Sequence, residues 1–523
     1  MEPTPDLCRF YLRRVRFSVE PTRDHTSPYW RQTTLEFAFG AIALVCALSP
    51  LISGVEFSPD SVNFVVAAQN FLEHGEFFVF TNWPSHSLLP EVEPFTDFPP
   101  GYSIYLLPFL IILKDPFLAA TLAQAIAIVA FFISFRFLMA ALGWHPILRI
   151  AAFIAITVFS TYPLIYSHYW TEPLFLTCTL AVATCMVHAR SKNEVKWWWW
   201  AAFFAIAGSS LKYIGAFNIL WFLIPIASRA EQRLRRSALA LLACTLPIAL
   251  WFVRNELRYG RISFSHLLGE PELVHTLLRP FYFLLEDVLR INDVEVLSVI
   301  PLLAFLLLLV WPFRCDTKRF LDQLTGVHGM LVIAALGHSV GIWLLSLVTF
   351  FSLLDDRLLA PSITLGLVAA LNGINEVVKH RQGVDRILVL VLPFVFLLLS
   401  HHTTWPTLPW DRPAFAHPTE ESAWRDLRSK GGMDGATHFY SDRDFRHQLY
   451  ARIPQRILWD VDAIDHGLID SLLQTGKAPF FVLHTDQQGS LPLITALEQS
   501  ELGLQRWEYP QAKLIFFTRD ANH

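Results

Sequence analysis

Long apolar runs separated by short polar segments make up most of residues 34–402. A helix needs about 17–25 predominantly apolar residues to cross a bilayer, and many of these runs have that length. The pattern predicts eleven transmembrane helices, at Thr34–Gly54 and at 117–140, 146–166, 172–189, 197–211, 213–228, 236–254, 294–313, 328–351, 357–378 and 385–402. This region is therefore expected to be an all-α polytopic membrane protein.

One apolar stretch, Gly101–Leu113, is too short to be a span. At about 1.5 Å per residue it cannot cross a hydrocarbon core of about 30 Å. We predict an interfacial or partly inserted segment on the outer side of the membrane. If it were a true span, every later loop would change sides, so the charge of those loops tests this choice.

The charges between the apolar runs indicate a fixed orientation. Residues 1–33 are polar and contain several arginines, whereas the loop 55–100 contains seven acidic residues and no Lys or Arg. Lys and Arg are enriched in cytoplasmic segments, so the N-terminus is expected inside and this loop outside. The later loops alternate without a contradiction.

Residues 403–523 have a different character. Pro and His dominate 404–418, which predicts a linker. Beyond it we expect strands at Thr437–Ser441, Phe480–His484 and Leu514–Thr518, and helices at Leu491–Ser500 and in part of 463–474. The segment is therefore interpreted as a small C-terminal α/β domain on the extracytoplasmic side.

Three domains follow: a basic cytoplasmic N-terminus (1–33), a transmembrane domain (34–402) with a long outer loop (55–116), and the C-terminal domain (403–523). Of the 523 residues, 53% are hydrophobic and 16% charged, against roughly a quarter charged in soluble domains. The net charge of −4 neither favours nor excludes a polyanionic partner, and no nucleic-acid partner is expected. The six cysteines show no zinc-type spacing, and we expect no disulfide.

The stretch Phe57–Gly75 predicts a helix on the membrane surface with a carboxylate in its first turn. Pro59 suits a first-turn position, and Val62, Val65 and Val66 recur at helical spacing. Asp60 at the mouth of a membrane protein is a candidate catalytic group. It also suits the N-terminus of a helix for electrostatic reasons alone, so both interpretations stay open.

The predicted topology places further ionisable residues on the same side. Asp97 lies in the long loop, Glu172 and Arg357 begin spans, and Lys212 interrupts an apolar stretch. Ionisable groups at membrane spans often mark functional sites. The simpler explanations are a helix N-terminal carboxylate for Glu172, snorkelling for Lys212, and a salt bridge to a neighbouring aspartate for Arg357.

Carboxylates and cations at the outer edge of a bilayer suit group transfer from a lipid-phosphate carrier. Lys, Arg or a metal ion would stabilise the leaving phosphate. A carboxylate would act as general base towards an acceptor hydroxyl. A single displacement at the anomeric carbon of a sugar would invert its configuration.

The order of these features resembles the GT-C superfamily of membrane glycosyltransferases, including bacterial protein O-mannosyltransferases and aminoarabinose transferases. The similar stretches are Ser58-Pro-Asp60-Ser-Val-Asn-Phe, Asp97-Phe-Pro-Pro-Gly101-Tyr102, Tyr166-Ser-His168-Tyr-Trp-Thr-Glu172, Ser210-Leu-Lys212-Tyr-Ile-Gly215 and Asp356-Arg357-Leu-Leu-Ala-Pro361. Each motif is short, and their order and sidedness carry the resemblance.

The resemblance implies an inverting glycosyltransferase in the bacterial inner membrane that uses a polyprenyl-phosphate sugar donor. Its acceptor would be a glycan, glycolipid or protein. It implies that Asp60 and Glu172 are catalytic, and that the substrate-binding residues are Asp97, Lys212, Arg357, His168 and Tyr102. No cofactor is certain, and a divalent metal ion remains open. Some relatives have a Lys before the Pro-Pro pair where this chain has Phe98.

Two other function classes remain open. A transporter or lipid flippase would usually show internal repeats and charges near the bilayer midplane, and the sequence shows neither. A non-catalytic envelope assembly protein would use the C-terminal domain as its working part.

Overall fold

The computed structural model describes residues 29–53, 58–80, 92–158, 161–192, 194–227, 233–260, 326–348, 356–379, 417–430, 439–441, 455–457, 481–485, 494–495, 497–498 and 504–519. The helices of the main bundle within these residues are α2 (Tyr29–Ser53), α5 (Pro116–Ala141), α6 (Pro146–Val158), α7 (Thr161–Tyr166), α8 (Glu172–Lys192), α9 (Val195–Leu211), the 3-10 helix η1 (Tyr213–Ile219), α10 (Leu220–Ala227), α11 (Arg233–Tyr259), α15 (Val327–Val348) and α16 (Asp356–Lys379).

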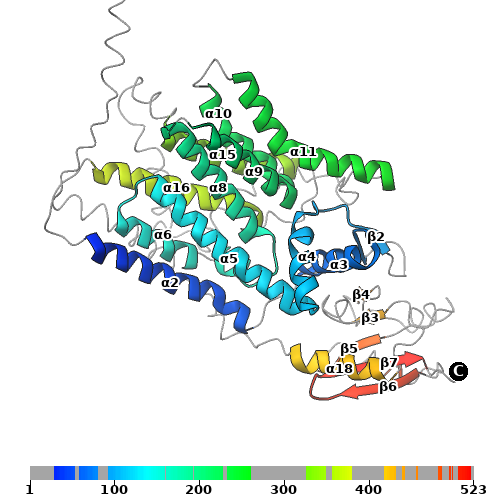
Figure 1. Ribbon diagram of the computed structural model, residues 1–523. Coiled ribbons are helices and arrows are strands. Elements are labelled where there is room, and N and C mark those ends of the chain that lie inside the picture. The colour runs from blue at the N-terminus through cyan, green and yellow to red at the C-terminus, as the bar shows by residue number, and fades with distance from the viewer. Residues whose placement is uncertain are drawn as a thin grey trace, which may run out of the picture.

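The bundle is built around α8, which packs against both α5 and α9. Helix α2 packs against α6, α11 against α9, and α15 against α16 (Figure 1). The interior is apolar and aromatic, with Phe131, Phe135 and Tyr162 fully buried. This packing leaves α8 largely enclosed, so the residue with which it begins is enclosed as well.

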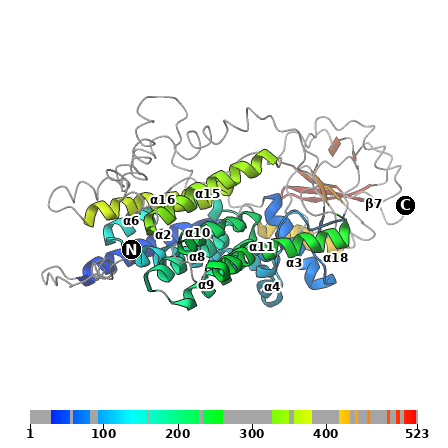
Figure 2. The ribbon, with the colours of Figure 1, turned by 90° about the horizontal axis from the view of Figure 1, so that it is seen from above.

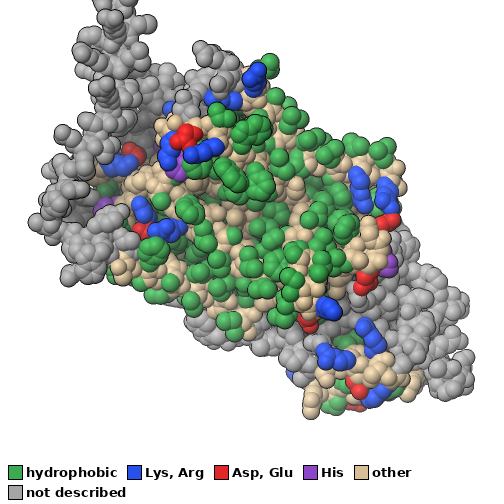
Figure 3. All heavy atoms as spheres, viewed as in Figure 1, with side chains coloured by type: hydrophobic (Ala, Val, Ile, Leu, Met, Phe, Trp, Pro, Cys, Tyr) green, Lys and Arg blue, Asp and Glu red, His purple; other side chains and the backbone are tan. Residues whose placement is uncertain are grey.

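The bundle has the surface of a membrane protein. Four described helices are long and apolar enough to cross a bilayer, namely α2, α5, α8 and α11. Figure 3 shows a broad apolar area over the middle of one face, with charged side chains towards its edges. On α5, the exposed side chains include Leu118, Leu122 and Ile126, which recur every four residues and so form one stripe.

Two of the predicted spans are wrong as single helices. The predicted span 146–166 consists of α6, which ends at Val158, and α7, which begins at Thr161. Pro163 suits the first turn of a new helix and not the interior of a long one. The predicted span 213–228 is the 3-10 helix η1 followed by α10. The predicted spans 294–313 and 385–402 lie outside the described residues.

Two short helices and a hairpin cover one end of the bundle. They are α3 (Pro59–His74), α4 (Gly101–Leu113), β1 (Phe78–Phe80) and β2 (Val92–Pro94), with β1 and β2 antiparallel (Figures 1 and 2). As predicted, Pro59 lies in the first turn of α3. Gly75, with φ of 73°, ends this helix in the left-handed conformation that glycine adopts readily. The Asn70 side chain donates to the Phe78 carbonyl (2.9 Å), which holds the hairpin against α3.

The described part of residues 403–523 contains α18 (His417–Ser429) and a five-stranded sheet with strand order β4-β3-β5-β7-β6. Strands β3 (Phe439–Ser441), β5 (Phe481–His484) and β7 (Leu514–Arg519) lie where strands were predicted. Strands β4 (Gln455–Ile457) and β6 (Leu504–Tyr509) were not predicted, nor was α18. The first two residues of α18 fall within the predicted linker 404–418, so the linker prediction is wrong at those two residues. The predicted helix in 463–474 lies outside the described residues.

Helix α18 packs on the sheet and closes a small separate core. Trp424 meets Phe516 edge-on, with ring centroids 4.9 Å apart. Asp426 accepts hydrogen bonds from Lys430 (2.5 Å) and Tyr509 (2.7 Å), and these bonds lower the pKa of its carboxyl group. Phe117, at the start of α5, packs against this core. The sheet therefore lies near the end of the bundle at which α5 begins.

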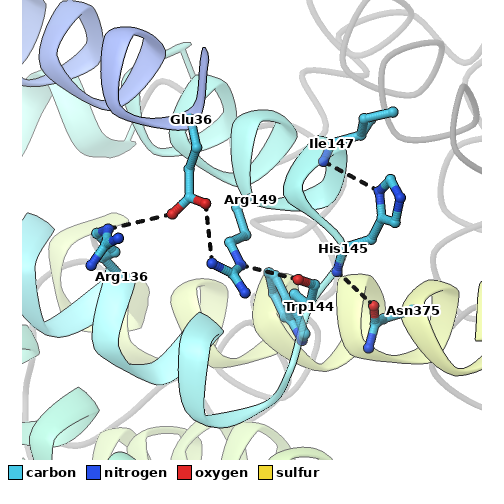
Figure 4. Close-up of polar contacts among 7 residues, drawn as sticks. All are labelled: Glu36, Arg136, Trp144, His145, Ile147, Arg149 and Asn375. Atoms are coloured by element: carbon cyan, nitrogen blue, oxygen red, sulfur yellow. Dashed lines mark hydrogen bonds and ion pairs between the residues drawn. The ribbon is translucent and has the colours of Figure 1, made fainter. Parts of the chain in front are cut away.

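A buried ion cluster lies at the opposite end of α5 (Figure 4). The side chain of Glu36 in α2 is 3% exposed and faces two arginines, Arg149 Nη1 at 3.0 Å and Arg136 Nε at 3.3 Å. The Arg149 Nε also donates to the carbonyl of Trp144, whose indole N–H donates to Asn372 of α16 (3.0 Å). One carboxylate and its partners thus hold α2, α5, α6 and α16 together.

We expect Glu36→Gln to destabilise the bundle. Removal of one member of a buried ion pair costs about 3–5 kcal/mol, and the low end applies here because Arg136 is partly exposed. The melting temperature in detergent should fall by about 5 °C or more. The matched control is Glu376→Gln, which breaks an exposed pair with Lys379 and should shift melting by about 2 °C at most. Equal shifts in the two variants would contradict a clamping role for Glu36.

Candidate active site

The candidate site is built on a buried ion pair between Glu172 and Lys212. Glu172 is the first residue of α8, and its side chain is 3% exposed. The Nζ of Lys212 lies 2.5 Å from Glu172 Oε1, and the Lys212 side chain is 15% exposed. The Thr171 hydroxyl lies 3.3 Å from the other carboxylate oxygen. A charge-assisted contact of this length fixes both side chains.

Lys212 reaches Glu172 because the chain leaves the helical conformation there. Lys212 is extended, with φ −146° and ψ 144°, between the end of α9 and the start of η1. At Gly215, a Cβ would lie 2.5 Å from the carbonyl oxygen of Gly208, so only glycine permits this close approach. The interruption that Lys212 causes in the hydropathy pattern is therefore a real break in the helix.

The start of α4 lies in close contact with the end of α9, just before Lys212. A Cβ on Gly101 would lie 2.3 Å from the carbonyl oxygen of Ser210. Any larger residue there would move α4 away from the end of α9. The Gly residue of the Pro-Pro-Gly stretch thus brings the outer loop within reach of the segment that carries Lys212.

Asp60 lies in the first turn of α3 and is half-buried. Ser58 caps this helix by accepting a hydrogen bond from the Ser61 amide. The indole N–H of Trp170 donates to the same Ser58 hydroxyl at 2.6 Å. Since Trp170 lies two residues before Glu172, this bond joins the start of α3 to the segment that leads into α8. The start of the helix that carries Asp60 is thereby bonded to the segment that precedes Glu172.

The segment between α7 and α8 is anchored by the two residues that precede Trp170. His168 Nδ1 lies 2.9 Å from the Leu164 carbonyl, and its ring stacks on Trp170 with centroids 4.0 Å apart. The Tyr169 hydroxyl shares a hydrogen bond of 2.7 Å with Thr121. In the structure His168 therefore supports Trp170, and its predicted contact with substrate stays a prediction.

Tyr102 is fully buried behind this segment. Its hydroxyl donates to Gln124 Oε1 (3.1 Å), and the Gln124 amide donates to the carbonyls of His168 (2.7 Å) and Ile165 (3.1 Å). Through Gln124, Tyr102 fixes the backbone in front of Glu172. Its predicted contact with substrate stays a prediction.

The remaining predicted residues are Asp97 and Arg357. Asp97 is half-buried between β2 and α4, beside Phe98, whose ring packs on Phe64 with centroids 5.1 Å apart. Arg357 lies in the first turn of α16, and its side chain is outside the described part of the structure. Among the described residues, no group of three or more His, Cys, Asp or Glu side chains is arranged to hold a metal ion.

Three residues that organise the site were not singled out from the sequence: Ser58, Gln124 and Trp170. Ser58 precedes a proline at a helix start, which is a recognisable capping signal. Gln124 is an isolated polar residue within an apolar span, and such residues commonly hydrogen bond inside a bundle. Trp170 had no such signal, because its partner lies 112 residues away in the chain.

Comparison with known proteins defines the class of fold. No protein-family model and no curated protein matches the sequence. Solved structures do match, and the chain has the fold of the GT-C glycosyltransferases. At the identities found, of 10–15%, the likeness defines the fold alone.

The similar structures include ArnT from Cupriavidus metallidurans in the apo state, with a TM-score of 0.53 and 13% identity over 94% of this chain and 99% of that chain. The arabinofuranosyltransferase AftD from Mycobacteria has a TM-score of 0.56 and 15% identity over 93% of this chain and 40% of that chain. The oligosaccharyltransferase AglB from Archaeoglobus fulgidus has a TM-score of 0.52 and 10% identity, covering 94% and 75%.

We expect substitutions at Glu172 and Lys212 to have strongly coupled effects on the stability of the protein. Glu172→Gln and Lys212→Met each leave one buried charge without its partner, so each should lower the melting temperature by about 5 °C or more. The double variant should be more stable than the sum of the two single effects predicts, with a coupling of about 1–3 kcal/mol. Thermal unfolding of the purified protein in detergent measures all three.

The control is the same cycle on the exposed pair Glu76 and Arg258, whose side chains are 42% and 50% exposed. Exposed pairs are worth about 0–1 kcal/mol, so that cycle should be close to additive. Additive effects at Glu172 and Lys212 would show that the two charges act independently.

Proposed function

We propose that the protein is an inverting glycosyltransferase. It would transfer a sugar from a polyprenyl-phosphate carrier to an acceptor hydroxyl on the extracytoplasmic face of the membrane. The observation that carries the proposal is the buried Glu172–Lys212 pair in a chain with the GT-C fold, with the segment before Glu172 bonded through Trp170 to Ser58 at the start of the Asp60 helix. A carboxylate and a cation held together at the rim of a membrane bundle suit a phosphate leaving group.

The reaction needs one displacement. The acceptor oxygen forms a bond to the anomeric carbon of the sugar, and the bond from that carbon to the phosphate oxygen breaks, its electron pair leaving with the phosphate. Asp60 takes the proton from the acceptor hydroxyl. The phosphate is already a weak base, so no separate general acid is required. Attack opposite to the leaving group inverts the anomeric configuration.

Lys212 would bind the carrier phosphate. Its ammonium group has three donors, and among the described residues one of them is used, on Glu172, which leaves donors for phosphate oxygens. Glu172 would act by aiming the ammonium group, since a preorganised cation stabilises developing charge without reorganising during the reaction. Asp97 and Arg357 are further candidates for binding donor or acceptor.

The similar structures support a lipid-linked donor. ArnT from Cupriavidus metallidurans has been solved bound to undecaprenyl phosphate. AglB from Archaeoglobus fulgidus has been solved in complex with an inhibitory peptide and a dolichol-phosphate. The carrier class is therefore proposed for this chain, whereas its sugar and acceptor are left to the experiment below.

The proposed sidedness rests on charge and on packing. The N-terminus would be cytoplasmic, because residues 1–33 are basic and the loop that contains Asp60 has no Lys or Arg. Helix α18 and the sheet would be extracytoplasmic with α3 and α4, since their core contacts Phe117 at the start of α5. In a bacterium the membrane would be the inner membrane.

Asp60→Asn should lower transfer by about 10²–10⁴-fold, the usual contribution of a general base. The measurement compares envelope glycans and glycolipids by mass spectrometry in cells that lack the protein and in cells that regain wild-type or variant protein. The residue missing from the deleted cells identifies sugar and acceptor, and its rate of return measures transfer.

The matched control is Glu73→Gln, which removes an exposed carboxylate from the last turns of the same helix and should leave transfer unchanged. Full transfer by a normally folded Asp60→Asn protein would rule out Asp60 as the base. A deletion that changes no glycan while the carrier lipid accumulates on one side would instead favour a flippase.

A further inference from the structure

We propose that Trp170 is the positioning residue of this site, and that its indole N–H fixes the helix bearing Asp60 against the segment bearing Glu172. The inference rests on the proposed function for its catalytic consequence. The geometry on which it stands is independent of that function. Trp170 is 6% exposed, and its N–H lies 2.6 Å from the Ser58 hydroxyl oxygen.

The Ser58 hydroxyl is fully used by its neighbours. It accepts hydrogen bonds from the Ser61 amide (3.2 Å) and from Trp170, and it shares a third bond of 3.0 Å with the Ser61 hydroxyl. A hydroxyl has one donor and two acceptor sites, so these three contacts satisfy it completely. The Trp170 bond is therefore part of the cap of α3, and its loss would leave that cap one partner short.

Trp170 itself is held rigidly. Its ring stacks on His168, with an interplanar angle of 17°. The backbone on its N-terminal side is tied to α5 through Gln124, and Tyr169 is tied to Thr121 of the same helix. On its C-terminal side the chain enters α8 at Glu172. The indole therefore links the start of α3 to a segment that is itself fixed to α5 and continuous with α8.

This connection matters because it joins the first turn of α3 to the segment before α8, whereas the apolar side chains of α3 share one buried cluster with residues of α5 and α8. Helix α3 packs chiefly on α4 and β1, both of which lie at the same end of the molecule. A displacement of about 1 Å between reacting groups can reduce a rate by about 10²-fold. The Trp170 bond acts at the end of α3 that carries Asp60, so it would adjust the distance between Asp60 and the Glu172–Lys212 pair within the limits that the apolar packing of α3 allows.

The test uses Trp170→Phe, which keeps an aromatic ring to stack on His168 and removes the N–H together with part of the buried indole. The expected result is a rise of about three- to tenfold in amide hydrogen exchange of residues 58–66, as loss of one hydrogen bond predicts. Glycan product formation should fall about tenfold or more. Affinity of the purified protein for undecaprenyl phosphate should change less than about threefold, because Lys212 and Glu172 are untouched.

The structure offers a matched control in Trp144, another buried tryptophan whose N–H bonds to a side-chain oxygen, that of Asn372. Trp144→Phe should leave exchange of residues 58–66 and product formation unchanged. Ser58→Ala should reproduce the Trp170→Phe effects, Ser58→Thr should retain normal behaviour, and the double variant with Ser58→Ala and Trp170→Phe should be little worse than Ser58→Ala alone.

Unchanged exchange of residues 58–66 in a folded Trp170→Phe protein would overturn the inference, and so would raised exchange with undiminished product formation. If the wild-type protein forms no glycan product, the proposed function fails. The exchange experiment would still decide whether Trp170 holds α3.

Discussion

The site depends on one electrostatic requirement: a carboxylate buried at the start of α8 needs a positive partner. Glu172 finds it in Lys212, which reaches the carboxylate only because α9 ends and the chain turns extended. That break in turn requires glycine at 215, where the backbone of Gly208 is too close for any side chain. The ion pair, the interrupted helix and the close backbone contacts are therefore one arrangement.

The helix N-termini near this ion pair bring further ionisable groups to the site. The first turn of α3 brings Asp60, α8 begins with Glu172, and α4 begins at Gly101 against Ser210. Helix N-termini carry partial positive charge, which favours anionic groups nearby. Elements from distant parts of the sequence thus meet at one end of an apolar bundle, where a lipid-borne anion would arrive.

The sequence was sufficient to predict features whose cause is local. The helix at 57–75 follows from Pro59 and apolar periodicity, and the limited length of α4 follows from thirteen apolar residues. Hydropathy could not separate α6 from α7, since both helices are apolar. The Ser58–Trp170 bond escaped prediction because it joins residues that meet only after the helices pack. Asp60 and Glu172 were named from the sequence and their catalytic roles stay predictions, whereas the structural role of Gln124 was not predicted.

The buried ion cluster at Glu36 has a consequence for how the protein is inserted and folded. Glu36 lies at the beginning of the first span, and Arg149 follows it by 113 residues. At about 5–20 residues per second, translation delivers that arginine roughly 6–23 s after Glu36. During this interval the carboxylate must remain at the lipid headgroups or beside the insertion machinery, because burial without a partner is unfavourable. Helix α2 therefore reaches its final place only after α5 and α6 have entered the membrane, although it is synthesised first.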